Sequence, residues 1–225
     1  MMRFAAIGPL VCLLVACQAA PESRDHARAA LERNGWPFTA DGFVAAAQRK
    51  DDRIVATYLA AGMKPDARDR HHHTALISAA GGGRLRTVER LLAAGADPSP
   101  AGAFRRTPLV NAAIAGNHRI VKILLGAGAE VSARDDLGFS ALYVAAERGD
   151  LRMAKLLLDY HAPLETTTVS GNTALLAAVN FGNTELARLL LRHGASPQHR
   201  NHDGQNAFDL ANSTGQSDMA RLLAR

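Results

Sequence analysis

The chain has 225 residues, a formal net charge of +5, two cysteines and 5 % aromatic residues. The length predicts one elongated domain, and two cysteines exclude a disulfide-stabilised scaffold. Because no run of basic residues exceeds two and the arginines are scattered along expected helices, the positive charge does not indicate a nucleic-acid-binding protein.

The first residues have the layout of an export signal. Residues 1–3 form a short basic head, and residues 4–16 form an apolar run that is too short to cross a bilayer, which needs about 20 residues. The run ends in Leu-Val-Ala-Cys at residues 14–17, which resembles the bacterial lipobox. The resemblance implies that residues 1–16 are a signal peptide and that Cys17 carries a diacylglycerol. An ordinary signal peptide followed by a chance cysteine is the alternative.

Lipidation would define the setting of the mature protein. Gln18 after the cysteine favours sorting to the outer membrane of a double-membraned bacterium, with the protein facing the periplasm. Removing residues 1–16, of which only Arg3 is charged, leaves 209 residues and lowers the net charge from +5 to +4. Because Cys12 would be cleaved away and Cys17 acylated, the mature chain would contain no free thiol and no disulfide.

A short N-terminal helix is expected next. Ser23 can cap a helix that runs to Arg33, three apolar residues within 27–31 share one face, and the Asn-Gly pair at residues 34–35 ends it. Residues 17–35 would therefore contain the lipidated cysteine, a short tether and this helix.

The rest of the chain repeats every 33 residues. The triplet at residues 74–76 has equivalents at 107–109, 140–142, 173–175 and 206–208. Nine residues after each triplet begins there is a glycine, and a leucine pair follows in each unit. These glycines are Gly83, Gly116, Gly149, Gly182 and Gly215. A period of this size indicates stacked units, none of which can bury its apolar face alone.

This pattern resembles the ankyrin repeat, whose signature runs D-x-x-G-x-T-P-L-H-x-A-A and continues with a glycine, a leucine pair and Gly-Ala. The resemblance covers residues 36–225 and implies an all-α solenoid of six helix-turn-helix units with β-turn fingers. The expected repeats are 36–68, 69–101, 102–134, 135–167, 168–200 and 201–225. The threonine or serine would cap the first helix of each unit, and the glycines would supply positive φ where helices end.

Three departures from the signature stand out. The histidine after the triplet is absent in every unit; the residues there are Ile77, Val110, Tyr143, Leu176 and Asp209. His161 replaces the glycine that ends the second helix of unit 135–167, where histidine tolerates the left-handed region better than most residues. The unit at 36–68 fits least well, with Asp41 at the cap position and Lys50 and Asp51 near the glycine position.

The sequence does not predict catalysis. It contains no Gly-x-Ser-x-Gly elbow and no His-Glu-x-x-His pair, and residues 81–83 end at the regular inter-helix glycine instead of following a strand. The three histidines at 71–73 could bind a metal loosely, but sequence neighbours do not converge on one ion. We therefore expect a non-enzymatic protein without a metal or cofactor, and an unrecognised carboxylate pair is the enzymatic alternative.

In the ankyrin family, partners are held by the fingers and by the first-helix face. The corresponding positions are Arg68, Arg70, His71, His73, Phe104, Arg106, Ile114, Arg134, Leu137, Phe139, Glu147, Arg148, Val169, Asn172, Asn180 and Phe181. Apolar side chains among arginines are typical of interaction sites. We expect Phe104, Phe139, Arg106 and Arg148 to form one continuous patch. The alternative is that the phenylalanines at these positions pack into neighbouring repeats.

The sequence thus predicts a monomeric ankyrin-repeat lipoprotein that binds another envelope protein through its concave face. Two roles suit this location in the cell envelope. One is an immunity or inhibitor protein that neutralises a periplasm-acting toxin or phospholipase, and the other is an accessory factor in envelope oxidative-stress defence. A hydrolase would need a pocket with converging polar groups, which a continuous solenoid lacks.

Overall fold

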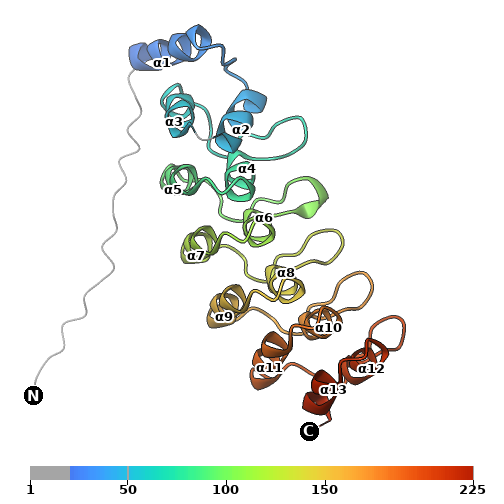
Figure 1. Cartoon of the computed structure of the whole chain (residues 1–225). Coiled ribbons are helices and arrows are strands. Elements are labelled where there is room, and N and C mark those ends of the chain that lie inside the picture. The colour runs from blue at the N-terminus through green and yellow to red at the C-terminus, as the bar shows by residue number, and fades with distance from the viewer. Residues whose placement is uncertain (1–20, 50, 225) are drawn as a thin grey trace, which may run out of the picture.

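The computed structural model describes residues 21–49 and 51–224, which form pairs of helices stacked in a row (Figure 1). The expected signal peptide and Cys17 lie outside the described residues. Within those ranges, no helix has both the length and the apolar character needed to cross a membrane.

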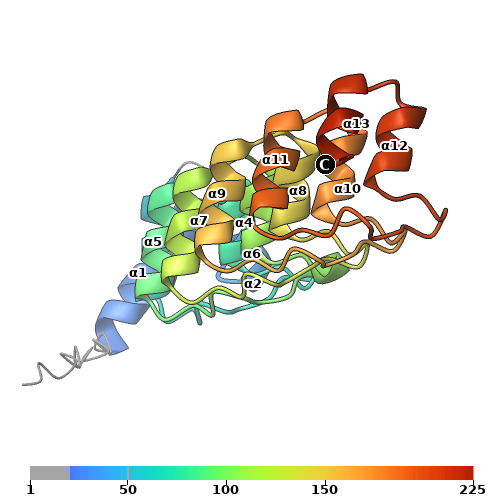
Figure 2. The ribbon, with the colours of Figure 1, turned by 90° about the horizontal axis from the view of Figure 1, so that it is seen from below.

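The chain begins its described part with helix α1 (Pro21–Arg33), and the helices that follow form two rows. The inner row contains α2 (Ala40–Gln48), α4 (Ala75–Gly81), α6 (Pro108–Ile114), α8 (Ala141–Glu147), α10 (Ala174–Asn180) and α12 (Ala207–Ser213). The outer row contains α3 (Asp52–Ala60), α5 (Leu85–Ala93), α7 (His118–Gly126), α9 (Leu151–Asp159), α11 (Thr184–Arg192) and α13 (Ser217–Leu223). Each inner helix packs on the next, as do the outer helices from α3 to α11, and α1 packs on α3. Figure 2 shows both rows with the long loops beside the inner one, which confirms the ankyrin solenoid.

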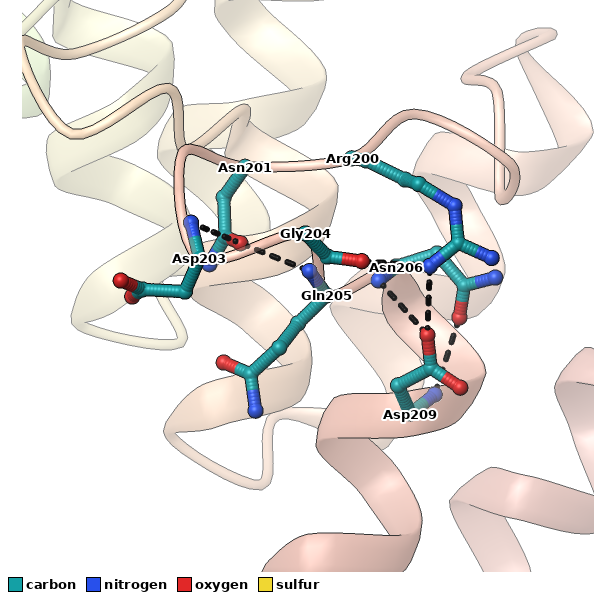
Figure 3. Close-up of polar contacts among 7 residues, drawn as sticks. All are labelled: Arg200, Asn201, Asp203, Gly204, Gln205, Asn206 and Asp209. Atoms are coloured by element: carbon teal, nitrogen blue, oxygen red, sulfur yellow. Dashed lines mark hydrogen bonds and ion pairs between the residues drawn. The ribbon is translucent and has the colours of Figure 1, made fainter.

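Each inner helix from α4 onward begins at the polar residue that the repeat predicts. The side chains of Thr74, Thr107, Ser140 and Thr173 accept a hydrogen bond from the backbone N–H three residues on, at 3.2 to 3.4 Å. Asn206 does the same for α12 and completes a capping box with Asp209 (Figure 3). These bonds satisfy backbone donors that the first turn of a helix leaves without a partner.

The N-terminal end differs from the prediction in two places. Helix α1 spans Pro21–Arg33, so Ser23 lies inside it and is not its cap. Helix α2 is capped by Thr39, two residues earlier than expected, while Asp41 instead accepts hydrogen bonds from the loop that follows α3. Asp51 caps α3.

The turns between helices have the backbone conformation that the glycines predict. All five inter-helix glycines have φ between 66° and 72°, and His161 takes φ 60° at the end of α9. Both findings agree with the expectation that these positions need the left-handed region.

The core runs the length of the stack. One leucine of each outer helix from α5 to α11 is fully buried, namely Leu91, Leu124, Leu157 and Leu190. At the N-terminal end the core is aromatic: Tyr58 is fully buried, lies 5.4 Å from Phe43 between ring centroids and donates a 2.7 Å hydrogen bond to the Pro37 carbonyl. This cluster fills the core of repeat 36–68, the repeat that fits the signature least well.

Candidate functional site

Five loops project beside the inner helices, at residues 68–73, 101–106, 134–139, 167–172 and 200–205; we call them the fingers. Three of them are folded by one side chain near their start. The Oδ1 atom of Asp69, Asp135 or Asn201 accepts two backbone N–H bonds, from the residues two and four positions on, at 2.8 to 3.1 Å. Figure 3 shows this arrangement around Asn201. These bonds hold the finger in its folded conformation without a partner.

The finger at 101–106 is built differently. Gly102 replaces the folding side chain, and Arg105 occupies the position of Gly138 in the next finger. Phe104 and Arg105 take φ 55° and 54°, a region that bulky residues rarely adopt. The segment Ala103–Arg105 forms a short 3-10 turn, and the Phe104 side chain is 73 % exposed.

The fingers from 101–106 onward are joined edge to edge by their backbones. The Asp136 N–H donates to the Phe104 carbonyl at 2.9 Å, and the Val169 N–H donates to the Leu137 carbonyl at 3.0 Å. Phe104, Leu137 and Val169 therefore lie on three adjoining fingers, and the last two are 50 % and 60 % exposed. An apolar strip that meets water on a folded protein marks an interaction surface.

The three phenylalanines of the predicted set have different surroundings. Phe104 and Phe181 do not pack into neighbouring repeats, since more than half of each side chain is exposed. Phe139 is partly buried and stacks on Tyr143 of its own repeat, with ring centroids 4.8 Å apart. Phe139 thus supports the base of its finger, and Tyr143, which the sequence analysis did not select, lies beneath it.

The arginines of the fingers have roles within the stack that the sequence analysis did not assign to them. Arg68 donates a 2.7 Å hydrogen bond to the Ala101 carbonyl of the next finger. Arg106 lies 3.4 Å from the buried carboxylate of Asp135. These positions therefore join neighbouring repeats. Arg134 is exposed.

The ends of the inner helices form the other part of the predicted set. Arg148 donates a 3.1 Å hydrogen bond to the Ile114 carbonyl, so these two residues are brought together between α6 and α8. Burial, with a smaller contribution from Glu147, raises the pKa of Tyr143. Asn180 and Phe181 are exposed at the end of α10, and no described contact joins either of them to Phe104.

A hollow of about 530 Å³ lies between α2, α4 and the first finger. Its wall includes Asp41, Arg70, His71 and His73. Arg70 pairs with Asp41 at 2.9 Å, and its backbone and side-chain hydrogen bonds hold the pKa of Asp41 below the ordinary value. Over residues 21–49 and 51–224, no three His, Cys, Asp or Glu side chains converge as a metal site would require.

A smaller hollow, of about 160 Å³, lies beside the last two fingers. Asn172 and Asn180 both line it, and the side-chain amide of Asn201 donates to Asn172 Oδ1 at 3.1 Å. The structure therefore divides the predicted residues into a contiguous finger group and separate helix-end groups. It also adds Arg105, which sequence reasoning missed although it stands where later fingers have glycine.

These side chains offer cationic, aromatic and amide contacts along a rigid edge. A comparison with protein families bears on what such an edge does: the model described as ankyrin repeats (3 copies) matches residues 43–135, 83–168 and 142–225. The chain is an ankyrin-repeat protein. A search of curated proteins found no match. Ankyrin-repeat proteins are generally non-enzymatic modules for binding other proteins, and the finger face, which comprises the fingers and the inner-helix ends, is suited to that use.

Proposed function

We propose that this ankyrin-repeat protein is an exported lipoprotein that binds another protein of the bacterial envelope through its finger face and catalyses no reaction. The observation that carries the proposal is the strip formed by Phe104, Leu137 and Val169. These side chains are exposed on fingers whose backbones are hydrogen-bonded to one another. A strip that is already rigid loses little conformational entropy when a partner covers it.

The proposed location rests on the sequence of the first 17 residues. A basic head, a short apolar run and a lipobox-like Leu-Val-Ala-Cys imply cleavage before Cys17 and its acylation. Only three residues lie between Cys17 and Pro21, the first residue described in α1, so a lipid on Cys17 would hold the solenoid close to the membrane.

Capture of a partner tests the binding face. The full-length protein is immobilised and incubated with detergent-solubilised envelope proteins, and the captured partner is titrated against variants. Leu137→Ala with Val169→Ala should weaken binding about thirtyfold, because truncating a desolvated interface anchor costs about 2 kcal/mol. The matched control is Arg152→Ala with Lys155→Ala, two exposed residues of the outer helix α9. If the control pair abolishes binding and the finger pair does not, the assignment of the face is wrong.

The location has its own test. Cys17→Ser should prevent incorporation of labelled palmitate and move the protein from the membrane fraction to the soluble fraction. A wild-type protein that is already soluble, or that never takes up the label, would contradict the lipoprotein assignment while leaving the binding face unaffected.

A further inference from the structure

The fingers differ in charge along the stack. Residues 68–73 and 101–106 hold four arginines and one aspartate, whereas residues 167–172 and 200–205 hold one arginine and one aspartate. We infer that the partner presents an acidic segment, which docks across the first two fingers and Arg134 and packs an apolar side chain on Phe104. This inference rests on the proposed function, because it specifies the partner for the same face.

Not every arginine of this region is available to a partner. Arg70 pairs with Asp41, and Arg106 lies against the carboxylate of Asp135. Arg68 bonds only to backbone carbonyls, so its charge is not neutralised.

Two further arginines remain free to pair. Arg105 and Arg134 are exposed, and within the described ranges neither side chain has a hydrogen bond or ion pair. Of the nearby acids, Asp69 is hydrogen-bonded only to N–H groups of its own finger and keeps its charge, and Asp136 is exposed. Arg68, Arg105 and Arg134 therefore outnumber these two acids by one.

Hydrogen bonds between the fingers bring the residues that carry these charges near Phe104. Arg68 reaches the Ala101 carbonyl at the start of the second finger, at 2.7 Å. The third finger, which begins with Arg134, is joined to the Phe104 carbonyl through the Asp136 N–H at 2.9 Å. An exposed aromatic side chain flanked by free guanidinium groups has the composition of an interface hot spot, and its charge complements a carboxylate-rich segment.

The unusual backbone of this finger supports a binding role for it. The position of Arg105 takes positive φ in all five fingers, whereas the position of Phe104 does so in the second finger alone. A positive φ costs free energy for non-glycine residues and concentrates at functional sites. The second finger is held by the hydrogen bond from the Gly102 N–H to the Arg106 carbonyl, 3.0 Å long. A Cβ on Gly102 would lie 2.8 Å from Ile77 Cδ1, so a larger residue there would have to displace the Ile77 side chain of α4. The backbone that carries the exposed aromatic ring is thus constrained.

A protein segment explains this surface better than an anionic membrane does. Helix α1 packs on α3 of the outer row, and the fingers project on the opposite side of the inner row (Figure 1). A chain anchored ahead of Pro21 would therefore turn its fingers away from the anchored side. A membrane-bound finger face is the competing outcome of the experiment.

The test measures binding of a short fluorescent peptide in which glutamates alternate with leucines, using its glutamine counterpart as the neutral control. The full-length protein should bind the acidic peptide at least tenfold more tightly than the neutral one, and the preference should shrink as salt rises from about 50 to 300 mM. Arg105→Glu with Arg134→Glu should lower the affinity about tenfold or more. Arg105→Gly keeps the positive φ without the charge, so it should reproduce part of the loss without unfolding the finger.

Two controls keep the inference falsifiable. Arg152→Glu with Arg192→Glu makes the same charge change on the outer helices and should leave peptide affinity unchanged. Phe104→Ala should weaken the acidic peptide without altering the thermal melt. Equal binding of the neutral peptide, equal loss in the control pair, or binding of phosphatidylglycerol vesicles in place of the peptide would overturn the inference. If the envelope partner is lost in the Leu137/Val169 variant but kept in Arg105→Glu, the proposed function stands and the acidic segment does not.

Discussion

The contact between neighbouring fingers can be tested by adding one methyl group at Gly138. This residue has φ +79°, and a Cβ there would lie 2.6 Å from the Thr168 Cα atom and 2.7 Å from the Thr167 carbonyl oxygen. The left-handed conformation costs an alanine roughly 1–2 kcal/mol. Since the obstructing atoms are backbone, the next finger must also move, which adds about 1–3 kcal/mol of overpacking. We expect Gly138→Ala to lower the free energy of unfolding by about 2–5 kcal/mol.

Equivalent glycines of the later fingers separate the two contributions. Gly204 has φ +75° and nothing within 4 Å of an added Cβ, so Gly204→Ala should cost only the conformational strain, about 1–2 kcal/mol. Gly171 is intermediate, because the nearest atom is His202 Cδ2 at 2.7 Å, in a side chain that can move.

Urea unfolding followed by far-ultraviolet circular dichroism measures all three variants. The free energies should be compared only where the denaturant slope is unchanged, because end repeats can unfold separately. The expected order of cost is Gly138 above Gly171 above Gly204. Equal costs at the three positions would show that strain alone matters and that the fingers are not in the tight contact described here.

Three other changes test the stack. Leu124→Ala removes a fully buried side chain and should cost about 2–5 kcal/mol in the same urea assay, and no loss would mean that the core is misplaced. Asp135→Ala leaves two finger N–H groups without their acceptor and frees Arg106, so it should cost roughly 2 kcal/mol or more; a Tm within one degree or so of wild type would contradict this. Arg90 holds the pKa of Asp52 below its ordinary value by a hydrogen bond, so this pair stabilises the fold above about pH 4 and the contribution is lost as pH falls through the lower folded pKa. Asp52→Asn should therefore cost up to about 1 kcal/mol at pH 7 and progressively less in acid, and a pH-independent difference would refute the ion pair.

The features that could be predicted from the sequence are those that recur once per repeat. A cap such as Thr74 or a turn glycine such as Gly149 has the same physical reason in every unit, so its spacing shows its role. Thr39 could not be placed in this way, because the first repeat departs from the spacing and its cap is decided by local geometry.

The binding face was predicted less completely, since its surface positions carry no periodic signal. Exposure of Phe104 and burial of Phe139 depend on whether a ring finds a neighbour, here Tyr143, and register alone does not determine that. The links made by Arg68 and Arg148 depend on the reach of a long side chain to a carbonyl of the preceding or following repeat.

The hydrogen bonds between repeats also determine how the protein would respond to tension. Side-chain bonds such as Asp66 to Asp97 and Asn183 to Ala146 join residues 31 and 37 positions apart, which is one repeat to the next. Force applied at the two ends would therefore load these junctions in series, and the weakest would open first while the others hold. Under such force the array would lengthen in steps of about one repeat and would shorten again when the repeats restack. Its extension would therefore be elastic and reversible.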